Sequence, residues 1–78
     1  MNMGEDRVKK IIISIIKEND LPMVEYTDIT NDTILTDDLG FDSFNLAQLT
    51  VEIESEFDVD IFENGVILTY GEILVQLK

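Results

Sequence analysis

The chain has 78 residues with neither cysteine nor histidine, so we expect one domain spanning residues 1–78 and exclude both a Ser-His-Asp triad and a cysteine nucleophile. Without a disulfide, a core this small leaves a net stability of about 3 to 5 kcal/mol, which favours a helical fold. The formal net charge is −12, and residues 18–77 hold fifteen acids but no lysine or arginine, which excludes nucleic-acid binding because phosphate contacts need clustered basic residues.

The first predicted element is a helix over residues 5–18. Five aliphatic residues share one helical face, with lysines interleaved: Val8, Ile11, Ile12, Ile15 and Ile16. The isoleucine run at 11–13 would also suit a buried strand, because isoleucine is β-branched. The helical spacing of apolar residues continues over residues 5–18, however, and favours a helix.

A long connection follows over residues 19–38, with one proline, four threonines and few apolar residues. Loops of this length are usually functional or disordered. Four aliphatic residues are expected to anchor this loop across the helices: Ile29, Ile34, Leu35 and Leu39.

A second helix is predicted over residues 43–57, with a serine at its start. Gly40 breaks the regular backbone structure before this helix, and Asp42 can cap the helix. Ser43 therefore lies at the positive end of the helix dipole. The free N–H groups of a first helical turn favour an anion, and a hydroxyl there suits a phosphate ester. Because Gly40 has no Cβ, another molecule can approach closely.

Two apolar stripes run along this helix. The stripe with core-facing spacing contains Leu46, Leu49, Ile53 and Phe57, joined by Thr50. The second is displaced by roughly a third of a turn and contains Phe44, Ala47 and Val51. Polar residues fill the remaining arc: Asn45, Gln48, Glu52, Ser55 and Glu56.

A small domain has trouble burying both stripes, so we interpret the second as a docking surface rimmed by Glu52, Glu54 and Glu56. The alternative is that the preceding loop or another helix covers it.

The C-terminal part is predicted to end in a helix over residues 70–77. Thr69 is its expected N-cap, and Glu72 completes a capping box. Its expected buried face contains Ile73, Leu74 and Leu77. Before it, the Asn-Gly pair at 64–65 is a turn signal, after which either a short helical turn or a hairpin strand over 66–68 is compatible with the sequence.

No metal site is predicted. With Gly40 as the invariant glycine of a calcium loop, leucines occupy ligand positions, and with Gly65 a phenylalanine does and a glycine replaces the final acid. The sequence has neither the features of a cleavable apolar leader nor an apolar run of spanning length. We therefore expect a cytoplasmic monomer that does not insert into membranes. Its acidity favours basic protein surfaces as partners, unless the charge serves only solubility.

Residues 38–44, Asp-Leu-Gly-Phe-Asp-Ser-Phe, resemble the signature of the acyl carrier protein family, and residues 53–61 are similar to the end of its second helix and the following loop. The order of the predicted elements also matches. The resemblance implies an all-α bundle of three to four helices with a long loop between the first two. It further implies that a phosphopantetheinyl transferase attaches 4′-phosphopantetheine to Ser43, which makes the chain a carrier of acyl thioesters and not an enzyme.

The resemblance also assigns roles to neighbouring residues. Asp42 maps onto the acid that helps to engage the transferase. Phe44, Val51 and Glu54 map onto positions that meet basic, apolar-centred patches of partner enzymes, with Ala47 between them. The implied partners are the transferase and the acyl-loading and acyl-transfer enzymes of fatty acid, lipid or polyketide biosynthesis.

Three residues depart from the family pattern. Phe44 replaces the usual leucine, Gln48 stands where fatty-acid-synthesis members commonly have glutamate, and Thr50 replaces an aliphatic residue. We expect the Thr50 hydroxyl to bond back to the Leu46 carbonyl. The departures point to a specialised pathway. Two alternatives stay open: a peptidyl or aminoacyl carrier of a nonribosomal-type pathway, and a non-catalytic acidic interaction protein in which Ser43 is only a helix cap.

Overall fold

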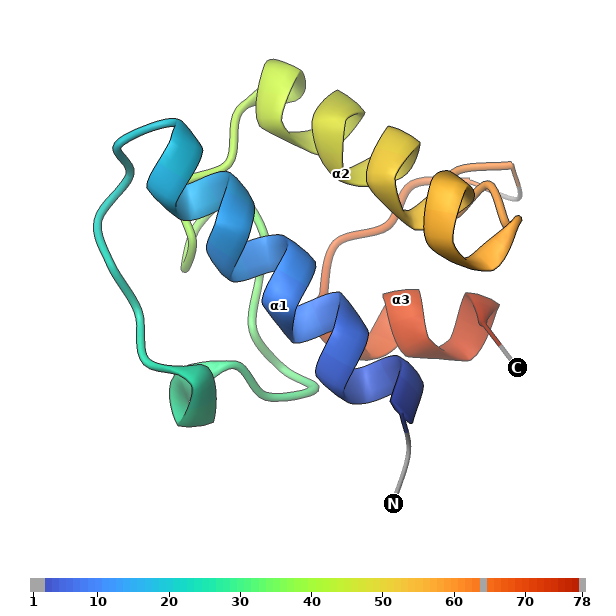
Figure 1. The fold of residues 1–78 in the computed structure, drawn as a ribbon, viewed down its shortest axis with the longest axis horizontal. Coiled ribbons are helices and arrows are strands. Elements are labelled where there is room, and N and C mark those ends of the chain that lie inside the picture. The colour runs from blue at the N-terminus through green and yellow to red at the C-terminus, as the bar shows by residue number, and fades with distance from the viewer. Residues whose placement is uncertain (1–2, 64, 78) are drawn as a thin grey trace.

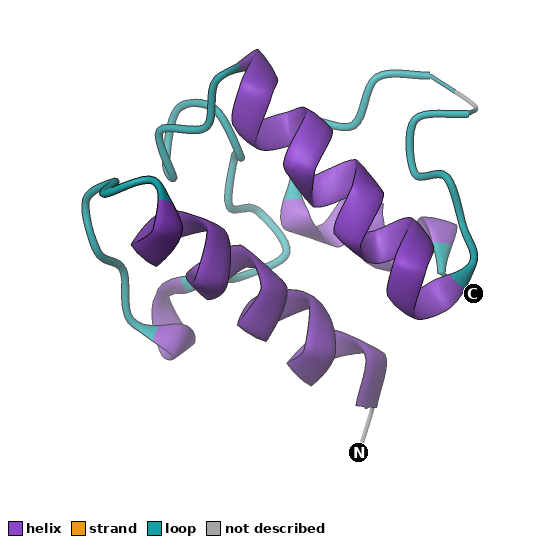
Figure 2. Ribbon diagram, turned by 45° about the horizontal axis from the view of Figure 1, so that its top comes forward, coloured by secondary structure: helices purple, strands orange, loops and turns teal. Residues whose placement is uncertain are grey.

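The computed structural model describes residues 3–63 and 65–77. It contains the α-helices α1 (Met3–Glu18), α2 (Ser43–Phe57) and α3 (Tyr70–Gln76), and one 3₁₀ turn, η1 (Tyr26–Asp28). Helices α1 and α2 lie side by side and run in opposite directions, with the short α3 near the start of α1 and the end of α2 (Figure 1). The loop after α1 passes through η1 and then returns to the start of α2 (Figure 2). The predicted all-α fold is confirmed, and the described residues form no strand.

The helix boundaries differ slightly from those predicted. The first helix begins two residues earlier than residue 5, and the last ends one residue before 77. The loop over 19–38 contains η1, which was not predicted. Neither a helical turn nor a hairpin forms at 66–68; the turn at Asn64 lies outside the described residues, while Gly65 adopts the positive φ of 134° that favours glycine.

The core is built on the aliphatic face of α1. Its buried members are Val8, Ile12, Ile15 and Ile16, while Ile11 is partly buried. From α2, Leu49 and Ile53 are buried and pack in the same cluster, as does Ile73 from α3. Leu46, Phe57, Leu74 and Leu77 are only partly buried. The core-facing stripe of α2 is therefore confirmed, and the Thr50 hydroxyl donates to the Leu46 carbonyl at 2.9 Å as expected.

The long loop is anchored as predicted by Ile29, Leu35 and Leu39, which are buried, whereas Ile34 is half-buried. The core also contains two aromatic residues that were not predicted there, Phe41 and Tyr70. Phe41 lies before α2 and outside any helical or strand period, so its burial has no pattern in the sequence. Tyr70 begins α3 and lies on the same helical face as Ile73, so the period was compatible with its burial.

Backbone hydrogen bonds join the loop to the segment before α3. The Leu35 N–H donates to the Leu68 carbonyl at 2.9 Å, and the Tyr70 N–H donates to the Thr33 carbonyl at 3.0 Å. Ile34 and Thr69 form an isolated antiparallel bridge between them. Residues 66–68 therefore do not form a hairpin, because the polar backbone groups at the end of this segment pair with the distant loop.

Gly71 allows this loop to approach α3 closely. Its N–H donates to the Asn31 carbonyl at 3.0 Å, and a Cβ added at Gly71 would lie only 2.8 Å from that carbonyl oxygen. The oxygen belongs to the backbone, so it cannot move aside as the end of a flexible side chain would. Glycine is thus required at this position by the packing of the loop.

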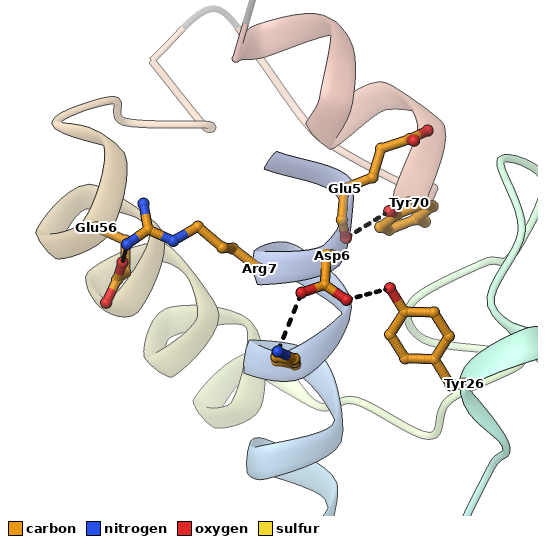
Figure 3. A network of polar contacts seen from close by, with 7 residues as sticks. Glu5, Asp6, Arg7, Tyr26, Glu56 and Tyr70 are labelled. Carbon is orange, nitrogen blue, oxygen red and sulfur yellow. Dashed lines mark hydrogen bonds and ion pairs between the residues drawn. The ribbon is translucent and has the colours of Figure 1, made fainter. Parts of the chain in front are cut away.

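The first turns of α1 bind three other parts of the molecule (Figure 3). The buried Tyr70 at the start of α3 donates its hydroxyl to the Glu5 carbonyl at 3.0 Å. The Tyr26 hydroxyl of η1 donates to Asp6, which also pairs with Lys10 at 3.0 Å. Arg7 forms an ion pair with Glu56 of α2 at 3.2 Å.

These contacts shift the pKa values of three side chains. Burial, followed by the nearby Glu5 carboxylate, raises the pKa of Tyr70 to about 12. The hydrogen bond to Asp6 raises the pKa of Tyr26. In return, the Tyr26 hydrogen bond, and then the bond from Lys10, lower the pKa of Asp6.

We predict that Gly71→Ala lowers the free energy of unfolding by about 1 to 2 kcal/mol, because the new methyl group overlaps a backbone oxygen and the loop must shift. The value is a net loss, because the higher helix propensity of alanine offsets part of the cost by at most about 1 kcal/mol. Urea unfolding followed by circular dichroism measures it. A variant as stable as the wild type would show that the loop does not lie this close to α3.

We also predict that stability falls as the pH rises from 10 to about 12. Folding raises the pKa of Tyr70 from 10.0 to about 12, so this tyrosine contributes its full stabilisation below pH 10. Between pH 10 and about 12 the tyrosine ionises in the unfolded chain but not in the folded protein, and the contribution is lost. Urea unfolding across this range should give a smaller decrease for Tyr70→Phe than for the wild type. Equal decreases would contradict the assignment to Tyr70.

Candidate functional site

The turn that precedes α2 is formed at Gly40. Its φ of 76° lies in the left-handed region, which a residue with a Cβ rarely adopts. The Gly40 N–H donates to the Thr36 carbonyl at 3.0 Å, and the Phe41 N–H donates to the Leu35 carbonyl at 3.1 Å. Apart from the two chain neighbours, no atom of residues 3–63 and 65–77 lies within 4 Å of a Cβ added at Gly40. Glycine is therefore needed for the backbone conformation, and the space beside it is open.

Asp42 caps α2, as predicted. Its carboxylate accepts a hydrogen bond from the Asn45 N–H, and the Asn45 side-chain oxygen accepts one from the Asp42 N–H, each at 2.9 Å. The prediction that Asn45 lies on the exposed polar arc is wrong, since only 3% of its surface is exposed. Its side chain turns back to close the capping box and thereby loses contact with water.

Ser43 is the first residue of α2 and is exposed. None of the hydrogen bonds among residues 3–63 and 65–77 involves its hydroxyl, and the Ser43 and Phe44 N–H groups likewise have no partner within that part of the chain. The helix cap is Asp42 and not Ser43, which removes the role that the interaction-protein alternative gave to this serine. An unbonded hydroxyl and free N–H groups at a helix start suit a phosphate ester.

The second apolar stripe of α2 is exposed, as predicted. The exposed fractions of Phe44 and Val51 are 68% and 66%, and Ala47 between them is also exposed. The alternative that the loop or another helix covers this stripe is therefore wrong. These three residues line a shallow groove, which we call the α2 groove, together with Glu18, Gln48 and Glu52.

The acidic rim of the stripe differs in part from the prediction. Glu54 is exposed as expected. Glu56 forms the ion pair with Arg7 and so is engaged by α1. Glu52 is only partly exposed, and its Oε2 atom is enclosed with no hydrogen-bond partner among the described residues. The three acids therefore do not form one uniform rim.

A wall of the α2 groove comes from the end of α1, which the sequence analysis did not anticipate. The Gln48 amide donates to Glu18 Oε2 at 2.7 Å, and the Ser14 hydroxyl donates to Glu18 Oε1 at 3.1 Å. The Asn19 amide donates to Gln48 Oε1 at 3.1 Å. Glu18 and Gln48 lie thirty residues apart, so no local pattern could have brought them together.

Within the described ranges, no group of three or more carboxylate, histidine or cysteine side chains is placed to hold a metal ion. Among the helices that the structure describes, none has the length and apolar character needed to span a bilayer. The start of α2 thus remains the candidate functional site.

Comparison with known proteins identifies the family of the chain. The family model described as "Phosphopantetheine attachment site" matches residues 6–71. The chain is 37% identical over 62 residues to the mitochondrial acyl carrier protein of Saccharomyces cerevisiae, a match that covers 77% of this chain and 50% of that protein, so the chain spans about half the length of this relative. No match was found among solved structures. The chain belongs to the acyl carrier protein family, whose shared domain is the attachment site for phosphopantetheine.

Proposed function

We propose that Ser43 carries the 4′-phosphopantetheine arm and that the domain presents acyl groups, bound to the arm as thioesters, to biosynthetic enzymes. The observation that carries the proposal is the exposed, unbonded Ser43 hydroxyl at the start of α2. The chain has two other serines. Ser14 lies within α1 and donates its hydroxyl to Glu18, and Ser55 lies near the end of α2, where no free N–H groups are available.

The residues around Ser43 prepare it as a substrate of a transferase. Asp42 holds the helix start in place through the capping box, and Gly40 forms the turn before it with a positive φ. The first-turn N–H groups and the helix dipole favour the negative charge of the attached phosphate. The chain contains no histidine, so we assign the base that removes the Ser43 proton to the transferase. When bound, the arm supplies the terminal thiol that holds the acyl group.

We assign partner docking to Phe44, Ala47, Val51 and Glu54, with Asp42 at the edge next to Ser43. An exposed apolar centre beside acidic side chains fits a transient interface with a basic protein surface. The proposed partners are the phosphopantetheinyl transferase and the acyl-loading and acyl-transfer enzymes. Such a domain works as a carrier, and the chemistry of each step belongs to the partner.

The cargo and the location are separate parts of the proposal. We favour an acyl cargo because the similar yeast protein is named an acyl carrier protein; an aminoacyl or peptidyl cargo would use the same arm and is the alternative. The monomeric state and the cytoplasmic location stay predictions. The yeast relative is mitochondrial by name, so a mitochondrial location is the competing assignment.

Intact mass spectrometry tests the role of Ser43. After incubation with coenzyme A, magnesium and a promiscuous transferase, the wild type and Ser55→Ala should each gain the mass of one arm, and Ser43→Ala should gain none. Ser43→Ala should lose no more than about 1 kcal/mol of stability, because Asp42 remains the cap. An unmodified wild type with several transferases, or a modified Ser43→Ala, would contradict the proposal.

Substitutions in the exposed stripe test the docking surface. Phe44→Ser and Val51→Ser should each change the free energy of unfolding by no more than about 1 kcal/mol, and each should lower kcat/KM for arm transfer about tenfold if it removes a central contact. The matched control is the buried Leu49, whose replacement by alanine should cost about 2 to 5 kcal/mol. Full transfer activity in both exposed-site variants would exclude this surface from docking to the transferase.

A further inference from the structure

The α2 groove has its apolar part on a segment of α2 that contains no acidic residue. Its apolar lining from Phe44, Ala47 and Val51 is all on α2, yet residues 43–51 of that helix contain no acid. Asp42 lies before this segment and Glu52 after it. A basic partner that approached α2 alone would therefore meet an apolar surface with no negative charge along more than two helical turns.

Helix α1 places a carboxylate beside this uncharged segment. Glu18, the last residue of α1, is exposed and lines the groove. Its two oxygens accept hydrogen bonds from Gln48 and Ser14 at 2.7 and 3.1 Å. Both donors are neutral groups, so they hold the position of the carboxylate without forming an ion pair with it.

Gln48 suits this arrangement because it is an amide. It donates to Glu18 through its nitrogen and accepts from Asn19 through its oxygen. A glutamate at position 48 would have no proton to donate and would face Glu18 with a like charge. A glutamine at position 48 therefore accommodates the Glu18 carboxylate beside it, whereas a glutamate there would repel it.

Glu52 marks the far end of this uncharged segment. It lines the α2 groove and also a second pocket, which it shares with Arg7 and Lys10 of α1. Because its Oε2 atom is enclosed, Glu52 is less available to a partner than the exposed Glu18.

We propose that the docking surface extends from α2 onto the end of α1, where Glu18 receives a lysine or arginine of the basic enzyme surface that binds beside Ser43. This inference rests on the proposed function and deepens it. It assigns partner recognition to a residue twenty-five positions before Ser43 and outside the helix that carries it. The charge that α2 lacks between Asp42 and Glu52 is supplied by the neighbouring helix.

The test measures kcat/KM for transfer of the arm from coenzyme A by a phosphopantetheinyl transferase, at low and high salt. Glu18→Gln removes the charge but keeps an oxygen that accepts from Gln48. The double variant Glu18→Gln with Gln48→Glu exchanges the two groups, so that the pair and its total charge are retained. The control is Glu63→Gln, which removes an exposed acid in the turn beyond the C-terminal end of α2. Thermal unfolding of each variant verifies that the fold is intact.

We expect Glu18→Gln to lower kcat/KM about threefold to tenfold at low salt, with the difference shrinking at high salt because the interaction is between exposed charges. The double variant should recover most of the loss, and Glu63→Gln should match the wild type. Arm transfer that is unchanged in Glu18→Gln, or not recovered in the double variant, would overturn the inference. A wild type that receives no arm at all would instead contradict the proposed function.

Discussion

The rest of the structure depends on burial of the aliphatic face of α1. Ile12, Ile15 and Ile16 are completely buried and pack with residues of α2, α3 and the long loop. In a chain of 78 residues with no cysteine, this apolar cluster is the main favourable contribution to folding. The ion pairs of Arg7 with Glu56 and of Lys10 with Asp6 are exposed, so they orient the elements and add little stability of their own.

This packing places α2 against α1 in a defined register. One end is joined by Arg7 and Glu56, and the other by Glu18 and Gln48. Because the two pairs lie at opposite ends of antiparallel helices, they hold the first turns of α2 beside the end of α1. The serine at the start of α2 and the groove next to it are therefore positioned by the packing of α1 against α2, together with the Asp42 cap.

The two apolar stripes of helix α2 differ in burial. Leu49 and Ile53 are buried on one side, whereas Phe44 and Val51 are exposed on the other. The exposed phenylalanine and valine form the apolar part of the proposed docking surface, and the net charge of −12 opposes self-association through it. The acids assigned to this proposed surface come from two helices, so it would form only in the folded domain.

Local features could be predicted from the residues because neighbours in the chain create them. The helical period of α1, the Asp42 cap and the Thr69 and Glu72 capping box follow from local spacings in the sequence. Contacts between distant segments left no such pattern. The Tyr70 bond to Glu5, the approach of Asn31 to Gly71 and the bond between Gln48 and Glu18 arise only when burial of the α1 face brings those segments together. The serine at the start of α2 and its Asp42 cap could thus be predicted from the sequence. The contribution of Glu18 to the α2 groove was decided by tertiary packing, because a hydrophobic period describes a single helix or strand and not the contacts between two of them.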